Sequence, residues 1–235
     1  SQGSAIEKVA KEFPKTTFAI IDSKVDLPNV QSITFKEQEG SFLVGIMGAM
    51  ASKTGKVGFI GGMDIPLIRR FECGYEQGAK YANPKVLTVT NMTGTTPAAW
   101  NDPARGAELA KSQFASGADV IFAAAGGTGI GVYQAAKDAG KLAIGVDSNQ
   151  NAVQPGTMLT SMVKRVDVAV YTAFKGVKPG VTTLGLKEDG VDVAIDPNNA
   201  KLVTPEMKKK VEAARAGIID GTIKVVDYMT TGSCS

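Results

Sequence analysis

Two aspartates and two glycines stand where a bound small molecule could meet them. Asp22 ends the apolar run TFAIID and Asp147 ends LAIGVD, while Gly61 and Gly126 close two further runs of the same kind. In an open parallel sheet such strand ends meet at one edge, where ligands bind. An ionised carboxylate there can accept hydrogen bonds from two neighbouring hydroxyls, as on a ribose. The alternative role for either aspartate is to cap a following helix.

A glycine-rich turn lies between a strand and a helix in the segment 123–140, AAAGGTGIGVYQAAKDAG. Its spacing departs from the dinucleotide fingerprint G-x-G-x-x-G, because Val132 occupies the third position beyond Gly129. We therefore expect Gly126 and Gly127 to let a ligand approach backbone N–H groups at the start of the helix. A tight turn without a ligand and a dinucleotide cofactor site are the alternatives.

Two aromatic residues and a lysine complete the candidate recognition set. Phe71 and Trp100, the only tryptophan, follow the segments GGMDIPLIRR and TPAA. Stacking on such a ring holds a planar base with about 1 to 3 kcal/mol. Lys164 follows the run TSMV and can donate to a hydroxyl or a ring nitrogen. Core packing of Phe71 and simple solvation of Lys164 are the competing interpretations.

Groups that catalysis would need are scarce in this composition. The 235-residue chain has no histidine, and no nucleophile stands out with a base and an orienting group. Cys73 and Cys234 match no zinc or redox spacing, so we expect one buried thiol and one thiol in a frayed tail. A net charge of +3 without a long basic block argues against nucleic acid as a partner. The sequence favours a binding protein over an enzyme, with neither metal nor cofactor.

Strand-like and helix-like runs alternate along the chain. We predict strands at 17–22, 56–62, 85–92, 119–127, 142–148 and 157–163, and helices at about 35–52, 65–82, 102–116, 131–139, 167–175 and 205–219. Residues that start or stop helices fall at the predicted ends: Asn101 or Asp102, Gly117, Gly140, Thr204 and Gly221. This alternation, with short apolar strands, is typical of a doubly wound α/β fold with parallel sheets.

The length suits two small lobes. We expect residues 1–54 to form part of the first lobe, 55–160 the second lobe, and 161–235 a return crossing, the remainder of the first lobe and a C-terminal helix. The chain opens with a helical run, Ile6 to Phe13, directly before a strand. An α/β lobe does not normally begin in this way, so the N-terminal part of the first lobe is expected to be missing.

Four segments, in this order, resemble the basic membrane protein family, which are bacterial lipoprotein receptors that bind purine nucleosides for ABC transporters. They are VGFIGGMDIPLIRRFECGYEQGAK, NDPARGAELAKSQFASGADVIFAAAGGTGIGVYQAAK, IGVDSNQ and LTSMVKRVDVAV. The resemblance extends from about Phe13 to Val225. It implies a type I periplasmic-binding-protein fold, with the ligand held between two lobes.

The resemblance also implies a role for each candidate residue. Asp22 would contact the base, Phe71 and Trp100 would line the base or sugar pocket, Gly126 and Gly127 would offer backbone contacts, Asp147 would hold the ribose hydroxyls, and Lys164 would reach the sugar. An ABC permease is the implied partner. The implied location is the periplasm or cell surface, through a lipid anchor outside this chain. The family's first strands, with a further stacking aromatic and an asparagine, have no match here.

The resemblance predicts that nucleoside binding draws the two lobes together. We expect the hinge crossings near Thr54–Lys56 and Thr160–Val163. An oxidoreductase or sugar-processing enzyme on the same fold, and the sensor domain of a regulatory protein, are the rival functions, because a fold alone does not determine function.

Overall fold

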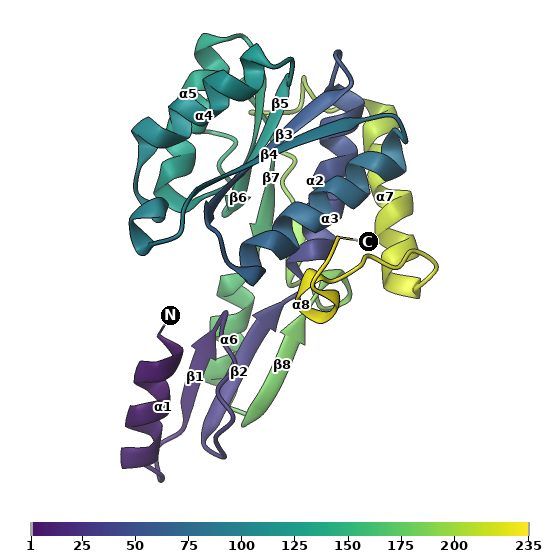
Figure 1. Cartoon of the computed structure of the whole chain (residues 1–235). Helices are drawn as coiled ribbons and strands as arrows, with labels where there is room; N and C mark the ends of the chain where they lie inside the picture. Colours follow the sequence, from purple (N-terminus) through teal and green to yellow (C-terminus); the bar gives the residue numbers. More distant parts are fainter. Residues whose placement is uncertain (1, 235) are drawn as a thin grey trace.

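The computed structural model describes residues 2–234, which form two lobes, each built on its own sheet (Figure 1). The larger sheet has six strands, and all of its neighbours pair in parallel except the antiparallel pair β7–β9. Its strands in spatial order are β4 (Leu87–Gly94), β3 (Lys56–Met63), β5 (Val120–Ala124), β6 (Leu142–Asp147), β7 (Met158–Lys164) and β9 (Val191–Val193). The predicted α/β class with parallel-rich sheets is confirmed.

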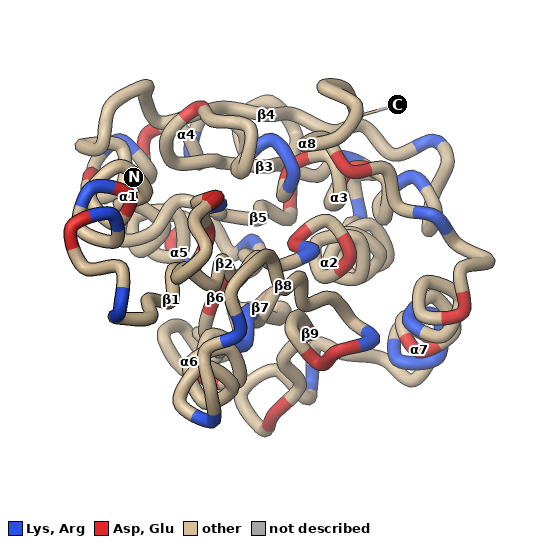
Figure 2. The backbone as a smooth tube through the Cα atoms, turned by 90° about the horizontal axis from the view of Figure 1, so that it is seen from below, with Lys and Arg blue, Asp and Glu red and all other residues tan. Residues whose placement is uncertain are grey.

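Helices cover both faces of this larger sheet, as expected for a doubly wound fold. On one face lie α4 (Pro103–Ala115) and α5 (Gly129–Asp138), and on the other lie α2 (Glu37–Ala51) and α3 (Pro66–Ala82), with α7 (Pro205–Asp220) packed on α2. Together they form the large lobe. Basic and acidic residues alternate over its helices rather than separating onto one side (Figure 2).

The small lobe has a three-stranded parallel sheet with β2 in the middle. Its elements are β1 (Phe18–Ile21), β2 (Val30–Phe35), β8 (Gly180–Leu184), α1 (Gly3–Glu12) and α6 (Val166–Lys175). The sequence did not predict β2 or β8. Polar residues interrupt both strands, and β2 pairs with β1 on one side and, about 150 residues along the chain, with β8 on the other.

Close packing of α2 against α3 sets the position of the helix that faces the small lobe. A Cβ atom at Gly78 of α3 would overlap the backbone of Phe42, and one at Gly45 of α2 would overlap the backbone of Tyr75. Glycine at these positions lets the two helix backbones approach closely. The N-terminal half of α3 is thereby held at the junction between the lobes (Figure 1).

Within the described residues the chain passes between the lobes three times: from β2 to α2, from β7 to α6, and from β8 to β9. These crossings differ from the expected ones, because residues 54–56 lead from α2 to β3 and residues 160–163 lie inside β7, all in the large lobe. The segment 161–235 contributes to both lobes, since β8 joins the small sheet while β9 and α7 join the large lobe. An apolar run reveals a strand but not the sheet that the strand joins.

The two cysteines form a disulfide, so the prediction of two separate thiols was wrong. The C-terminal segment returns along α3 and brings Cys234 beside Cys73, with 4.8 Å between their Cα atoms. The sequence separation of 161 residues concealed this proximity, because no local spacing signals a bridge of that length.

Candidate functional site

A cavity of about 190 Å³ opens between the lobes at the carboxyl ends of the parallel strands. Six of the seven predicted site residues line it, and the seventh, Gly127, packs beside Asn101 instead. The full lining is Asp22, Leu67, Ile68, Phe71, Trp100, Ala124, Gly126, Val146, Asp147 and Lys164. Two neighbouring hollows of about 390 and 440 Å³ share residues with it, so the cleft continues on either side.

Asp22 and Asp147 approach this cavity from opposite lobes. Asp22 follows β1 of the small sheet and Asp147 ends β6 of the large sheet. Both have left-handed backbone conformations, with φ of 63° and 66°, which aspartate tolerates better than most residues. Residues 148–157, which follow Asp147, form bends and turns and no helix, so Asp147 does not cap one. Strained backbone of this kind at two strand ends is typical of a functional site.

Lys164 is a buried cation at the centre of the site rather than a solvated surface lysine. It is 8% exposed, and its Nζ lies 2.8 Å from Asp22 Oδ2, 3.7 Å from Glu37 Oε1 and 3.8 Å from Asp147 Oδ1. Burial lowers the pKa of Lys164, but the carboxylates of Asp147, Glu37 and Asp22 outweigh burial and leave the pKa above its ordinary value. The ammonium group is therefore charged at neutral pH.

Two of the carboxylates around Lys164, those of Asp147 and Glu37, have pKa values above their ordinary values. Burial raises the pKa of Asp147, Lys164 lowers it, and the neighbouring Asp22 raises it again, with a net upward shift. More than half of the Asp147 side chain is accessible, and Asp147 lines two of the hollows of the cleft. Burial likewise raises the pKa of Glu37, against the lowering effects of Lys164 and Arg70. A ligand that donates hydrogen bonds to Asp147 would stabilise its charged form and so offset the effect of burial on its pKa.

Trp100 forms one wall of the cavity and is held there by its neighbours. It ends the short helix η1 (Pro97–Trp100), whose Ala99 carbonyl accepts hydrogen bonds from Thr93 Oγ1 at 2.9 Å and Thr128 Oγ1 at 2.8 Å. A Cβ atom at Gly62 would overlap the indole ring, so glycine there is what allows the ring to lie over the end of β3. The indole is thus positioned before any ligand arrives.

Replacing Gly62 with alanine is expected to push the Trp100 ring out of this position, because the added methyl group overlaps it. The result should be a shift of tryptophan fluorescence and greater quenching by acrylamide. Gly94→Ala is the matched control on the neighbouring strand, since its Cβ would lie at an ordinary 3.4 Å from Ala99 Cβ. Equal spectra for the two variants would contradict this account of how Trp100 is held.

Phe71 belongs to the core and to the cavity wall at once. It is 3% exposed, its ring centroid lies 6.5 Å from that of Phe122, and the Lys164 Nζ is 5.9 Å from its ring centroid. Leu67 and Ile68, one helical turn earlier, extend the apolar wall. Sequence reasoning missed these two residues, although the amphipathic pattern of α3 places them on the same face as Phe71.

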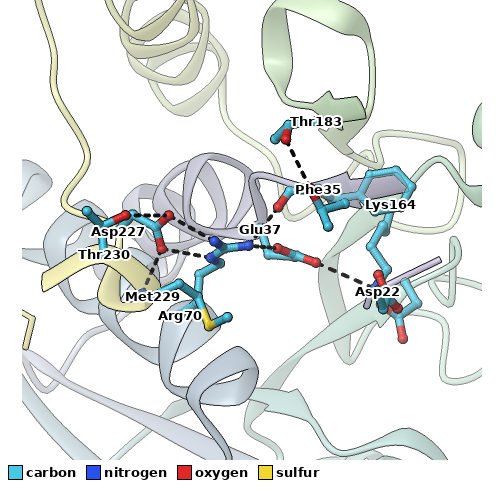
Figure 3. A network of polar contacts seen from close by, with 11 residues as sticks. Asp22, Phe35, Glu37, Arg70, Lys164, Thr183, Asp227, Met229 and Thr230 are labelled. Carbon is cyan, nitrogen blue, oxygen red and sulfur yellow. Dashed lines mark hydrogen bonds and ion pairs between the residues drawn. The ribbon is translucent and has the colours of Figure 1, made fainter. Parts of the chain in front are cut away.

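Glu37 and Arg70 are the other residues that the sequence did not single out. Glu37, 1% exposed, begins α2 directly after the crossing from the small lobe, and its Oε2 accepts from Arg70 Nη1 at 2.9 Å (Figure 3). Arg70 also donates to the carbonyl of Phe35 and, through two nitrogens at 2.8 Å, to Asp227. Their sequence context is that of ordinary helix residues, and only the tertiary contacts reveal their connection to Lys164.

The comparison with protein families agrees with this geometry. A family model described as Bmp, ABC transporter substrate-binding protein PnrA-like, matches residues 2–228. The chain belongs to the Bmp family. The chain is similar to the CD4+ T-cell-stimulating antigen of Listeria monocytogenes, with 39% identity over 94% of this chain and 66% of the relative. It is also similar to basic membrane protein D of Borreliella burgdorferi, with 38% identity over 92% of this chain and 66% of the relative. The ABC transporter nucleoside-binding protein BmpA of Lactococcus lactis is 36% identical over 94% of this chain and 67% of its own.

The chain thus spans about two thirds of the length of these relatives. Among solved structures, an ABC transporter solute-binding protein from Aeropyrum pernix superposes with a TM-score of 0.85 and 31% identity, over 96% of this chain and 75% of that one. A transcriptional activator of the comK gene from Bacillus halodurans superposes with a TM-score of 0.77 and 24% identity, over 98% of this chain and 76% of that one. At this identity the likeness shows a shared fold alone. The Bmp fold is that of ABC solute-binding proteins.

Proposed function

We propose that this protein is a receptor that binds a purine nucleoside between its lobes and presents it to an ABC transporter permease. The observation that supports this most is the shared cavity, in which two aspartates and a lysine lie beside aromatic walls. Such a surface combines hydrogen-bonding groups for a sugar with rings that can stack on a base. The Lactococcus relative is named as a nucleoside-binding protein, which supports the same ligand class.

In this proposal each lining residue meets one part of the nucleoside. Asp147 accepts hydrogen bonds from the ribose hydroxyls, and Lys164 donates to the sugar. Asp22 accepts from the base, while Trp100 and Phe71 provide its apolar walls. Gly126, with φ of 56°, offers backbone at the cavity edge without a side chain in the way. Gly127, which packs against Asn101, has at most an indirect role.

Transport in this proposal depends on lobe closure rather than on chemistry. A ligand that contacts Asp22 in one lobe and Asp147 in the other stabilises the closed arrangement, which the permease distinguishes from the open one. The relatives are substrate-binding proteins, in line with a protein that leaves its ligand unchanged. The three crossings between the lobes, at Lys36, at Arg165 and over residues 185–190, are the proposed hinges.

The proposed location is outside the cytoplasmic membrane, held by a lipid anchor. The family supports this location, because its model is described as an ABC transporter substrate-binding protein and one similar protein is named basic membrane protein D. Among residues 2–234, no helix combines the length and the apolar character that a membrane span requires. Labelling with radioactive palmitate in the source organism would test the anchor directly.

Isothermal titration with inosine, guanosine and adenosine tests the ligand class. Asp147→Asn is expected to weaken nucleoside affinity by about 1.5 kcal/mol, roughly tenfold, because charge-assisted hydrogen bonds to the sugar are lost. Asparagine also tolerates the left-handed backbone at this position, so the fold should be preserved. Asp138→Asn, an exposed change on α5, is the control. A folded wild-type protein that releases no heat with any of the three nucleosides would contradict the proposed function.

A further inference from the structure

The last residues that the structure describes, 226–234, form a segment that we call the C-terminal strap. It contains the short helix α8 (Tyr228–Thr231) and runs along α3. Three residues on α3 hold it: Gln77, which bonds the backbone N–H and C=O of Val226 at 2.8 and 3.1 Å, Arg70, which pairs with Asp227, and Cys73, which is bridged to Cys234. Their spacing of three and four residues puts them on one face of α3.

A line of alternating charges connects this strap to the proposed ligand site (Figure 3). Asp227 accepts hydrogen bonds from Nε and from Nη2 of Arg70, each at 2.8 Å. Arg70 Nη1 reaches one oxygen of the Glu37 carboxylate at 2.9 Å, and the other oxygen lies 3.7 Å from Lys164 Nζ. Each charge is therefore balanced by its neighbours, and loss of one leaves the next partly uncompensated.

The contacts of Arg70 fix the orientation of Glu37. The bidentate pair with Asp227 and the bond to the Phe35 carbonyl at 2.8 Å leave the guanidinium little freedom to rotate. The Glu37 carboxylate is 1% exposed, so water does not compete for its oxygens. Its second oxygen is thereby held toward Lys164, at 3.7 Å from Nζ.

The strap also lines the cleft itself. Met229 and Thr230 share the hollow of about 390 Å³ with Asp22, Lys24 and Thr183 of the small lobe. This hollow adjoins the proposed nucleoside cavity, because Asp22 and Leu67 line both. The strap is therefore part of the junction between the lobes rather than a tail on the outer surface.

We propose that Asp227, Arg70 and Glu37 are positioning residues for Lys164, which makes the C-terminal strap a working part of the ligand site. This rests on the proposed function and extends it, because it names residues outside the lining of the proposed nucleoside cavity that determine how strongly a ligand is bound. The disulfide keeps the strap on α3, and through Asp227 it keeps Arg70 aligned with Glu37.

Asp227→Asn tests the proposal in the intact protein. Asparagine can still cap α8, where Asp227 accepts from the Met229 N–H at 2.9 Å, but it no longer balances the charge of Arg70. We expect inosine affinity to fall about tenfold, the effect of one lost link in a coupled network. We also expect Lys164 to react faster with a trace of acetic anhydride, measured by mass spectrometry without any ligand.

Asp64→Asn is the matched control. Asp64 forms the same kind of bidentate pair with Arg69, the adjacent residue on α3, with both distances 2.8 Å. Arg69 also donates to Glu72, which is not among the carboxylates that surround Lys164. Asp64→Asn should therefore leave inosine affinity and Lys164 acetylation as in the wild type. In a Lys164→Met background, Asp227→Asn should change the remaining affinity by less than about twofold.

The possible outcomes separate this proposal from the proposed function. If the wild type binds no nucleoside, the function is wrong, but faster acetylation of Lys164 in Asp227→Asn still supports the positioning role. If Lys164 acetylation is the same in wild type and Asp227→Asn, the positioning role is overturned, whatever the affinity. Equal losses of affinity in Asp227→Asn and Asp64→Asn would also overturn it, because they would indicate a general loosening of α3.

Discussion

Replacing Lys164 with methionine is expected to lower the free energy of unfolding by about 3 kcal/mol at pH 7, because it removes the buried ammonium group that balances the charges of Asp22, Glu37 and Asp147. Methionine has a similar shape, so packing against Phe35 and Phe71 is largely kept. The measurement is urea unfolding followed by circular dichroism. Lys175→Met, an exposed change on α6, should have little effect and serves as the control.

The loss should depend on pH in a definite direction. The wild-type Lys164 pKa is raised, so its contribution to stability is full below the ordinary lysine pKa and is lost as the pH rises through the raised value. The raised pKa values of Asp147 and Glu37 mean that their ionisation costs stability as the pH rises through those values. Without Lys164 both pKa values rise further, and that cost grows.

The stability difference between wild type and Lys164→Met should therefore be smallest near pH 4, where protonation relieves the carboxylates. It should be largest near neutral pH and should narrow again at strongly alkaline pH, where wild-type Lys164 loses its own charge. Unfolding curves at pH 4, 7 and above 10 measure this. A difference that is constant across the three pH values would show that lost packing, not charge, causes the destabilisation.

Removing the Cys73–Cys234 bridge is expected to cost about 2 to 5 kcal/mol of stability, because the bridge closes a long loop in the unfolded chain. The two residues are 161 positions apart, and Cys73 is fully buried. Cys234→Ser is the suitable variant, since the remaining Cys73 thiol is well tolerated in a core. Guanidinium unfolding with and without a reductant measures the effect.

Reductant should lower the unfolding midpoint of the wild type toward that of Cys234→Ser and leave the variant unchanged. The reduced protein should also bind inosine more weakly than the oxidised protein, because the strap is then held to α3 without a covalent link, through the Arg70–Asp227 pair and the bonds of Gln77 to Val226. A wild type whose midpoint is insensitive to reductant would contradict a structural role for the bridge.

Local sequence signals predicted much of the fold because they report on the residue's own element. Gly117, Gly140 and Gly221 were predicted to stop helices, and all three have positive φ. Asp102, one of the two predicted starts of its helix, caps it by accepting from the Arg105 N–H, and Thr204 caps α7 by accepting from the Met207 N–H. Each of these interactions spans no more than three or four residues.

Strand-end placement also located most of the candidate site. Asp22, Gly126 and Asp147 follow or end parallel strands, and such ends converge wherever the sheets meet. Gly127 was included with Gly126 because adjacent glycines look equivalent in sequence. The structure separates them, since the left-handed turn at Gly126 directs the next residue toward Asn101. Glu37 and Arg70 gave no signal, because a charged residue in a helix is most often solvated.

The sequence by itself determined the α/β class, most helices and strands of the large lobe, and the polar and aromatic groups at the strand ends. Only the tertiary structure decided which sheet each strand joins, that Cys73 meets Cys234, and that Lys164 is buried among carboxylates. These features depend on contacts between residues distant in sequence, such as Lys164 with Asp22, 142 positions apart, and Cys73 with Cys234, 161 positions apart. Periodicity and capping describe the exposed and buried faces of one element, while such contacts depend on how all the elements pack together.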